Sequence, residues 1–125
     1  MDTYRVLFVD DEEELVTTIV ERLEYRGIDA DFALSGKKAL AKMREKSYDV
    51  VVLDLKMPGM SGADVMEVIR KEHPQIPVLL ITGHGSLDDE PEEKPEGAFD
   101  YLAKPINLED LLAKIQEALR SRGTP

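Results

Sequence analysis

Five residues with chemically active side chains each follow a short apolar run of the sequence: Asp10 and Asp11 after residues 6–9, Asp54 after 50–53, Thr82 after 78–81 and Lys104 after 101–103. If these runs are parallel strands of one sheet, their carboxyl ends meet along a single edge. Open α/β sheets bind their ligands just outside that edge, where the strand order reverses. The sequence therefore predicts one site with three carboxylates, a hydroxyl and an ammonium.

The chemistry of such a site follows from its charges. Three carboxylates within a few ångströms repel one another and raise the pKa of at least one of them unless a cation is present. Mg²⁺ suits this role, because it prefers oxygen ligands and commonly binds one or two carboxylates together with a phosphate oxygen. One carboxylate can then attack phosphorus, while Lys104 neutralises a phosphoryl oxygen and Thr82 hydrogen-bonds another. The pattern predicts an aspartate that accepts a phosphoryl group.

The elements that must position these residues follow from hydrophobic periodicity. The continuous apolar runs 6–9, 50–53 and 78–81 are typical of strands buried on both faces, whereas residues 28–32 alternate apolar side chains with aspartates, as a half-exposed edge strand does. Stretches with apolar residues three and four apart lie between the runs and predict amphipathic helices. We therefore expect an α/β fold, a doubly wound parallel sheet with helices on both faces.

Composition limits the class of protein. The 125 residues are enough for one domain, residues 1–125, and no apolar stretch approaches the length of a membrane span. The absence of cysteine excludes disulfides and thiolate metal sites, which suits a cytoplasmic protein. A net charge of −10 argues against direct nucleic-acid binding by this domain. We expect a cytoplasmic domain with no membrane partner.

Short motifs accompany the five residues along almost the whole chain: Asp10-Asp11, Asp54, Met57-Pro58-Gly59, Thr82-Gly83, Tyr101 and Lys104-Pro105. Together they resemble the receiver domain of two-component response regulators, including the single-domain chemotaxis type. The resemblance implies a flavodoxin-like sheet of five strands in the order 2-1-3-4-5. It also implies a phosphorylation-activated signalling switch that receives its phosphoryl group from a sensor histidine kinase or a phosphotransfer protein.

The resemblance further implies how the carboxylates divide their work. Asp54 is expected to be the phosphoacceptor. Asp11, Asp54 and the backbone carbonyl of Lys56 are expected to hold Mg²⁺, with Asp10 supporting the metal through water. Such a domain is a phosphoacceptor regulator and no enzyme in the usual sense, since it catalyses only its own phosphorylation and dephosphorylation.

The remaining motif residues are expected to bind and report the phosphoryl group. By the same resemblance, Lys104 bridges to the acyl phosphate, and a cis Lys104–Pro105 bond aims its ammonium into the site. Thr82 and Tyr101 form the switch pair. The Thr82 hydroxyl moves to the phosphoryl group while the Tyr101 ring turns inward into the vacated space.

Three other function classes compete with this interpretation. A flavodoxin-like cofactor carrier would bind phosphate on the loop after the first strand, but here residues 10–14 are all acidic and would repel it. Phosphatases with an aspartyl nucleophile typically carry a second aspartate two positions later, where this chain has Lys56. The third alternative is a receiver-like interaction module that acts independently of phosphorylation. A phosphorylation assay distinguishes it from the phosphorylated switch.

The segment 86–96 departs from the family pattern. It holds six acids, one lysine and two prolines where the fourth helix is expected. A proline inside a helix costs about 3 kcal/mol, so this helix is expected to be short, irregular or missing. Residues 88–96 are expected to be irregular or mobile in the free protein and, if the segment is functional, to order when a partner or a second copy covers the sheet face that it leaves open. The alternative is a solvated acidic loop without further function.

Overall fold

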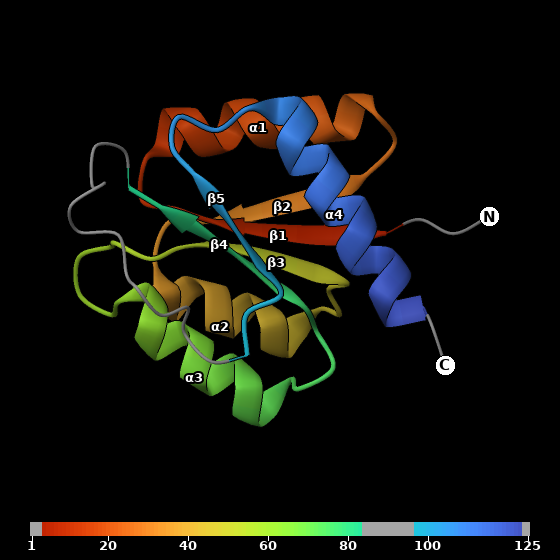
Figure 1. The fold of residues 1–125 in the computed structure, drawn as a ribbon. Helices are drawn as coiled ribbons and strands as arrows, with labels where there is room; N and C mark the ends of the chain where they lie inside the picture. The colour runs from red at the N-terminus through yellow and green to blue at the C-terminus, as the bar shows by residue number, and fades with distance from the viewer. Residues whose placement is uncertain (1–3, 84–96, 124–125) are drawn as a thin grey trace.

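Five parallel strands form one sheet in the order β2-β1-β3-β4-β5 in the computed structural model of the chain, which describes residues 4–83 and 97–123 (Figure 1). The strands are β1 (Arg5–Val9), β2 (Asp29–Ala33), β3 (Val50–Asp54), β4 (Val78–Thr82) and β5 (Asp100–Ala103). This order confirms the predicted flavodoxin-like sheet. The chain direction across the sheet reverses at β1 and β3, and these are the strands that lead into the aspartates.

Four described helices cover the two faces of the sheet: α1 (Glu13–Tyr25), α2 (Gly36–Glu45), α3 (Gly62–Glu72) and α4 (Leu108–Gly123). Figure 1 shows α1 and α4 on one face and α2 and α3 on the other. The side chains of β3 alternate between the two resulting cores. Val51 and Leu53 pack toward α2 and α3, and Val50 and Val52 pack toward α1 and α4. All four are fully buried, which explains why this strand is continuously apolar.

Local signals fix where several helices begin and end. Ser61 and Asp64 form a capping box at the start of α3, as their spacing predicts. At the start of α4, the Asp110 N–H donates to the Asn107 side chain. Gly27, just past α1, has a φ of 82°, a conformation that glycine adopts without strain.

Two predictions concern residues outside those that the structure describes: the short, irregular or missing helix in the segment 86–96, and the irregular or mobile residues 88–96. Between β4 and β5, the structure describes only Gly83 and residues 97–99. Within the described ranges, no helix is long and apolar enough to cross a bilayer.

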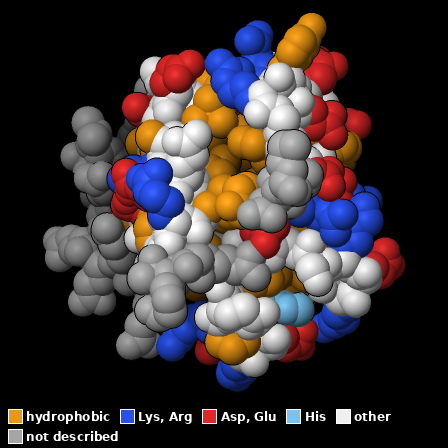
Figure 2. Space-filling view, turned by 90° about the vertical axis from the view of Figure 1, so that its right-hand side faces the viewer, with side chains coloured by type: hydrophobic (Ala, Val, Ile, Leu, Met, Phe, Trp, Pro, Cys, Tyr) orange, Lys and Arg blue, Asp and Glu red, His pale blue; other side chains and the backbone are white. Residues whose placement is uncertain are grey.

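A pocket of about 350 Å³ opens at the amino-terminal end of the sheet, and its walls are the segment before β4, the segment before β5 and the end of α4. Figure 2 views this side of the molecule and shows hydrophobic side chains gathered in a hollow. The pocket lining contains Pro74, Gln75, Ile76, Pro77, Gly97, Ala98, Phe99 and Ser121, none of which is charged. The charged residues predicted to act on phosphate, Asp10, Asp54 and Lys104, lie at the opposite, carboxyl end of the strands.

Candidate functional site

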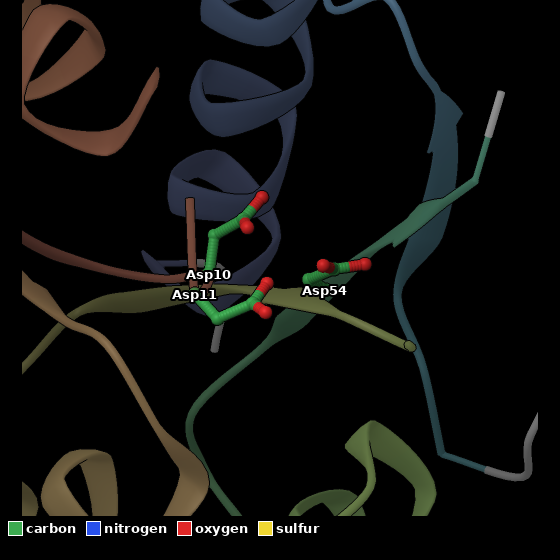
Figure 3. Close-up of side chains that lie close together, drawn as sticks. All are labelled: Asp10, Asp11 and Asp54. Carbon is green, nitrogen blue, oxygen red and sulfur yellow. The ribbon is translucent and has the colours of Figure 1, made fainter. Parts of the chain in front are cut away.

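Three carboxylates meet at the carboxyl ends of β1 and β3. Asp10 and Asp11 follow β1 directly, Asp54 is the last residue of β3, and the register pairs Val9 with Leu53, so Asp10 and Asp54 come at the same level of the sheet. Oxygens of the three side chains lie within 4.8 Å of one another, and Figure 3 shows the side chains gathered there. Asp10 and Asp54 are buried, whereas Asp11 is exposed. The cluster is thus anchored in the sheet and open to solvent on one side.

Backbone contacts hold the two buried carboxylates in place. The Asp10 N–H donates to the carbonyl of Ala33, and Asp10 Oδ1 accepts from the Glu12 N–H at 3.0 Å. The Lys56 N–H donates to Asp54 Oδ1 at 3.2 Å. These bonds orient one oxygen of each carboxylate and direct the other toward the centre of the site.

Gly62, the first residue of α3, allows this helix to approach the end of β3. A Cβ at this position would lie 2.5 Å from the carbonyl oxygen of Asp54 and 2.5 Å from Leu55 Cα. The Gly62 N–H donates to the Leu55 carbonyl, which ties the helix to the residue after the aspartate. A larger residue would have to displace backbone beside the site.

Lys104 brings a positive charge to the cluster from the loop after β5. Its Nζ lies 2.6 Å from Glu12 Oε1, 3.1 Å from Asp10 Oδ2 and 3.5 Å from Asp54 Oδ2. The Lys104 N–H donates to the carbonyl of Thr82, and the Lys104–Pro105 bond is cis, as predicted. The structure therefore brings Lys104 to the aspartates, as the sequence pattern predicts.

The buried carboxylates of the site repel one another, and burial and this repulsion both act on the pKa of Asp54. Burial, followed by the charge of Asp10, raises the pKa of Asp54 to about 6, against the lowering effect of Lys104. Burial by itself lowers the pKa of Lys104, but the ion pairs with Glu12 and Asp10 and the charge of Asp54 raise it above its usual value. One ammonium thus only partly offsets the repulsion between the carboxylates.

The donor set fits a hard divalent cation. It consists of carboxylate oxygens only, and Asp10 Oδ2 is shielded from solvent and accepts no well-aligned hydrogen bond from any described residue, despite its ion pair with Lys104. A buried carboxylate oxygen that accepts no well-aligned hydrogen bond favours a metal cation, or a water bound to one, beside it. Asp11, at the open side, completes the set.

Thr82 and Tyr101 lie on the two strands beyond β3. The register pairs Asp54 with Ile81, so Thr82 extends one residue beyond the level of the aspartate, and its hydroxyl donates to the Leu102 carbonyl at 3.4 Å. Tyr101 packs against the core on the α2–α3 face, with its hydroxyl oxygen shielded from solvent, and burial raises the pKa of that hydroxyl. The two residues lie on adjacent, paired strands, β4 and β5.

Glu12 is the residue of the site that the sequence analysis missed. Its shortest contact is to Lys104, 92 positions further along the chain. In the sequence it is one of five consecutive acids, and nothing in that run distinguishes it from its neighbours. The one signal in the sequence is Lys104, which follows the run 101–103 and is therefore predicted to lie at the same edge of the sheet as Glu12.

Comparisons with known proteins agree with this geometry. The sequence model of the response regulator receiver domain matches residues 6–116. An uncharacterized transcriptional regulatory protein of Bacillus subtilis, YkoG, is 38% identical over 124 residues, which are 99% of this chain and 54% of that protein. The probable transcriptional regulatory protein TcrX of Mycobacterium tuberculosis is 38% identical over 94% of this chain and 50% of its own length. The chain thus spans about half the length of these curated relatives.

Solved structures show the same fold along nearly the whole chain. A response regulator receiver domain protein from Clostridium thermocellum superposes with a TM-score of 0.87 at 37% identity, covering 96% of this chain and 97% of the other. The response regulator TrrA of Thermotoga maritima, solved in complex with Mg²⁺ and BeF, gives a TM-score of 0.82 at 32% identity, covering 94% of this chain and 100% of the other. The chain belongs to the response regulator receiver domain family.

Proposed function

We propose that this chain acts in a two-component system as a phosphorylation-activated switch whose phosphoacceptor is Asp54. The observation that carries the proposal is the position of the Lys104 ammonium, 3.5 Å from Asp54 Oδ2 at the centre of a three-carboxylate cluster. Membership of the receiver family supports it. The phosphorylation-independent module is disfavoured, because three carboxylates and the Lys104 ammonium lie together at one edge of the sheet.

Asp54 is suited to attack phosphorus. Its Oδ1 is held by the Lys56 N–H, which leaves Oδ2 facing the ammonium of Lys104. In the reaction, an Asp54 oxygen forms a bond to phosphorus, the bond from phosphorus to the donor histidine nitrogen breaks, and Lys104 neutralises a phosphoryl oxygen. The donor is a sensor histidine kinase or a phosphotransfer protein.

Asp11, Asp54 and the backbone carbonyl of Lys56 would hold Mg²⁺, with Asp10 supporting it through water. The metal, when bound, neutralises charge between the carboxylates and the incoming phosphoryl oxygens. The same groups catalyse the later hydrolysis of the acyl phosphate, so the chain's catalysis is confined to its own phosphorylation and dephosphorylation.

Phosphorylation is read out by Thr82 and Tyr101. The Thr82 hydroxyl donates to the Leu102 carbonyl over a long 3.4 Å bond, which is weak enough to exchange for a phosphoryl oxygen. Its movement changes the packing beside Tyr101, on the next strand. This switch alters the surface that β5 and α4 present to a partner.

We place this function in a single domain, residues 1–125, working in the cytoplasm. Its net charge of −10 disfavours direct contact of the domain with nucleic acid or with an anionic membrane surface. The curated relatives YkoG and TcrX are transcriptional regulatory proteins about twice as long, so an output partner or output domain is part of the proposal.

Incubation with acetyl phosphate and Mg²⁺, followed by intact mass measurement, tests the function. We expect a gain of one phosphoryl group that disappears when EDTA replaces Mg²⁺. No gain under conditions that phosphorylate a known receiver domain would favour the phosphorylation-independent module.

A further inference from the structure

Glu12 holds the ammonium that the phosphoryl group needs. The Nζ of Lys104 lies 2.6 Å from Glu12 Oε1 but 3.5 Å from Asp54 Oδ2. A charge-assisted hydrogen bond is strongest below about 2.9 Å, and 3.5 Å is beyond its normal range. Of its contacts with Glu12, Asp10 and Asp54, the ammonium makes the shortest with Glu12, which lies outside the carboxylate cluster.

Glu12 lies at the N-cap of α1, but its side chain does not cap the helix. It is the N-cap residue of α1, where a side chain normally accepts a hydrogen bond from the first turn of the helix, but its carboxylate makes no such bond. Instead, its N–H is fixed by Asp10 Oδ1 and its carboxylate reaches Lys104. The residue is thus committed to the site and contributes little to capping the helix.

Exposure distinguishes the two ends of this contact. The Lys104 side chain is 16% exposed and the Glu12 side chain 60% exposed. Glu12 can therefore swing into solvent, where water hydrates its charge, whereas Lys104 stays in the site beside Asp10 and Asp54. The contact can open when a stronger partner for the ammonium arrives.

We propose that Glu12 is a positioning residue that competes with the phosphoryl group for Lys104 and thereby weakens the phosphorylated state relative to the unphosphorylated one. The proposal rests on the proposed function of Asp54 and Lys104. A phosphoryl oxygen on Asp54 must draw the ammonium away from Glu12, so the strength of the Glu12–Lys104 bond sets part of the free energy of phosphorylation.

Two substitutions separate the contact from the charge. Glu12→Gln removes the charge and leaves a weaker, neutral acceptor. Glu12→Asp keeps the charge but shortens the side chain by one carbon–carbon bond, about 1.5 Å, which takes the carboxylate out of hydrogen-bond range of Lys104. Aspartate is also a favoured N-cap residue, so the helix start is preserved.

Glu13→Gln is the matched control. Glu13 is the next residue, exposed in the first turn of α1, and its substitution removes the same charge from the same end of the helix. Urea unfolding of all three variants checks that they fold as the wild type does.

The measurement is the affinity for beryllofluoride, an acyl phosphate mimic, at saturating Mg²⁺, followed by amide resonances of the site in NMR titrations. We expect Glu12→Gln and Glu12→Asp to bind it about three- to tenfold more tightly than the wild type, since the first weakens and the second removes the charge-assisted hydrogen bond that the ammonium must give up. Glu13→Gln should bind as the wild type does.

Other outcomes overturn the inference. If Glu12→Asp behaves as the wild type while Glu12→Gln and Glu13→Gln both bind more tightly, the effect is one of general charge. Unchanged or weaker binding by both Glu12 variants would mean that Glu12 does not compete for Lys104, with the proposed function left standing. A wild type that binds no beryllofluoride would overturn the proposed function together with this inference.

Discussion

The ammonium of Lys104 lies 3.5 Å from a carboxylate oxygen of Asp54, although 50 positions separate the two residues in the chain. The lysine reaches the aspartate because β4 pairs with both β3 and β5, and the Lys104 N–H continues the ladder to the Thr82 carbonyl. The charge that phosphoryl transfer needs is therefore positioned by the sheet itself. The sheet edge thus fixes the backbone position from which the lysine side chain reaches the site.

Removal of this ammonium should slow phosphorylation without abolishing Mg²⁺ binding. We expect Lys104→Ala to reduce the rate of phosphoryl gain from acetyl phosphate by about 10²-fold, because one preorganised charge at the transferred group is lost. Stopped intact-mass time courses give the rate. Lys37→Ala, at an exposed position of α2, is the control and should react normally. Equal rates for the two variants would contradict the assigned role of Lys104.

Asp11 should act mainly through the metal. Its side chain is the exposed member of the cluster, so Asp11→Asn removes a ligand charge at little structural cost. We expect Mg²⁺ affinity to fall about tenfold or more, since ligand charge sets the affinity of such sites. NMR titration with Mg²⁺ measures it. If saturating Mg²⁺ restores the phosphorylation rate, the loss lies in binding; unchanged affinity would contradict the ligand assignment.

Ionised Asp54 should destabilise the metal-free fold. Its pKa is raised to about 6 from 3.8, so the folded protein holds a proton that the unfolded chain releases, and stability falls as the pH rises from about 4 to 6. Asp54→Asn removes this penalty. In EDTA at pH 8, we expect the free energy of unfolding of Asp54→Asn to exceed that of the wild type by about 1 to 3 kcal/mol.

The pH dependence of that difference identifies its cause. Urea unfolding should show the advantage of Asp54→Asn shrinking at pH 5, where the wild-type carboxyl is largely protonated. Glu21→Gln, at an exposed position of α1, should show no such trend. An advantage that is the same at pH 5 and pH 8 would mean that side-chain packing, and not ionisation, is responsible.

Asp31 should contribute to stability and nothing to the chemistry. Its Oδ2 accepts from the buried Tyr48 hydroxyl at 2.7 Å and pairs with Lys46 at 3.2 Å. Burial alone would raise the pKa of Asp31, but these two bonds hold it below its usual value. The stabilisation is therefore fully present above the unfolded pKa and is lost as the pH falls below it.

We expect Asp31→Asn to lower the free energy of unfolding at pH 7 by about 1 kcal/mol, with the deficit shrinking in acid. Phosphoryl gain from acetyl phosphate should be unchanged, because Asp31 lies on β2, outside the carboxylate cluster. A variant that unfolds normally but reacts slowly would link β2 to the site in a way that the structure does not provide for.

Much of the fold could be predicted because its signals are local. The continuous apolar run of β3 reflects burial on both faces, and the spacing of Ser61 and Asp64 predicts the start of α3. The edge strand was also correctly predicted, since Asp29 and Asp31 of β2 are partly exposed on either side of the buried Ala30. The apolar run 101–103 located β5 but missed its first residue, Asp100, because that residue is acidic.

The parts of the site that the sequence could not predict depend on contacts between distant residues. Asp10, Asp54 and Lys104 lie together because each follows or ends a strand of the same parallel sheet, and hydrophobic periodicity predicts where those strands end. The Glu12–Lys104 contact depends on the direction of a long, exposed side chain, and no periodicity encodes that direction. The bond from Tyr48 to Asp31 likewise joins a loop to an edge strand whose aspartates look only like solvent-facing residues.

The central claim is that Asp54 carries the phosphoryl group, and reductive trapping tests it most directly. After incubation with acetyl phosphate and Mg²⁺, borohydride reduces an aspartyl phosphate to homoserine, which peptide mass spectrometry locates. We predict homoserine at position 54 in the wild type and none anywhere in Asp54→Asn. Homoserine at another aspartate, or a stable acyl phosphate on Asp54→Asn, would contradict the account.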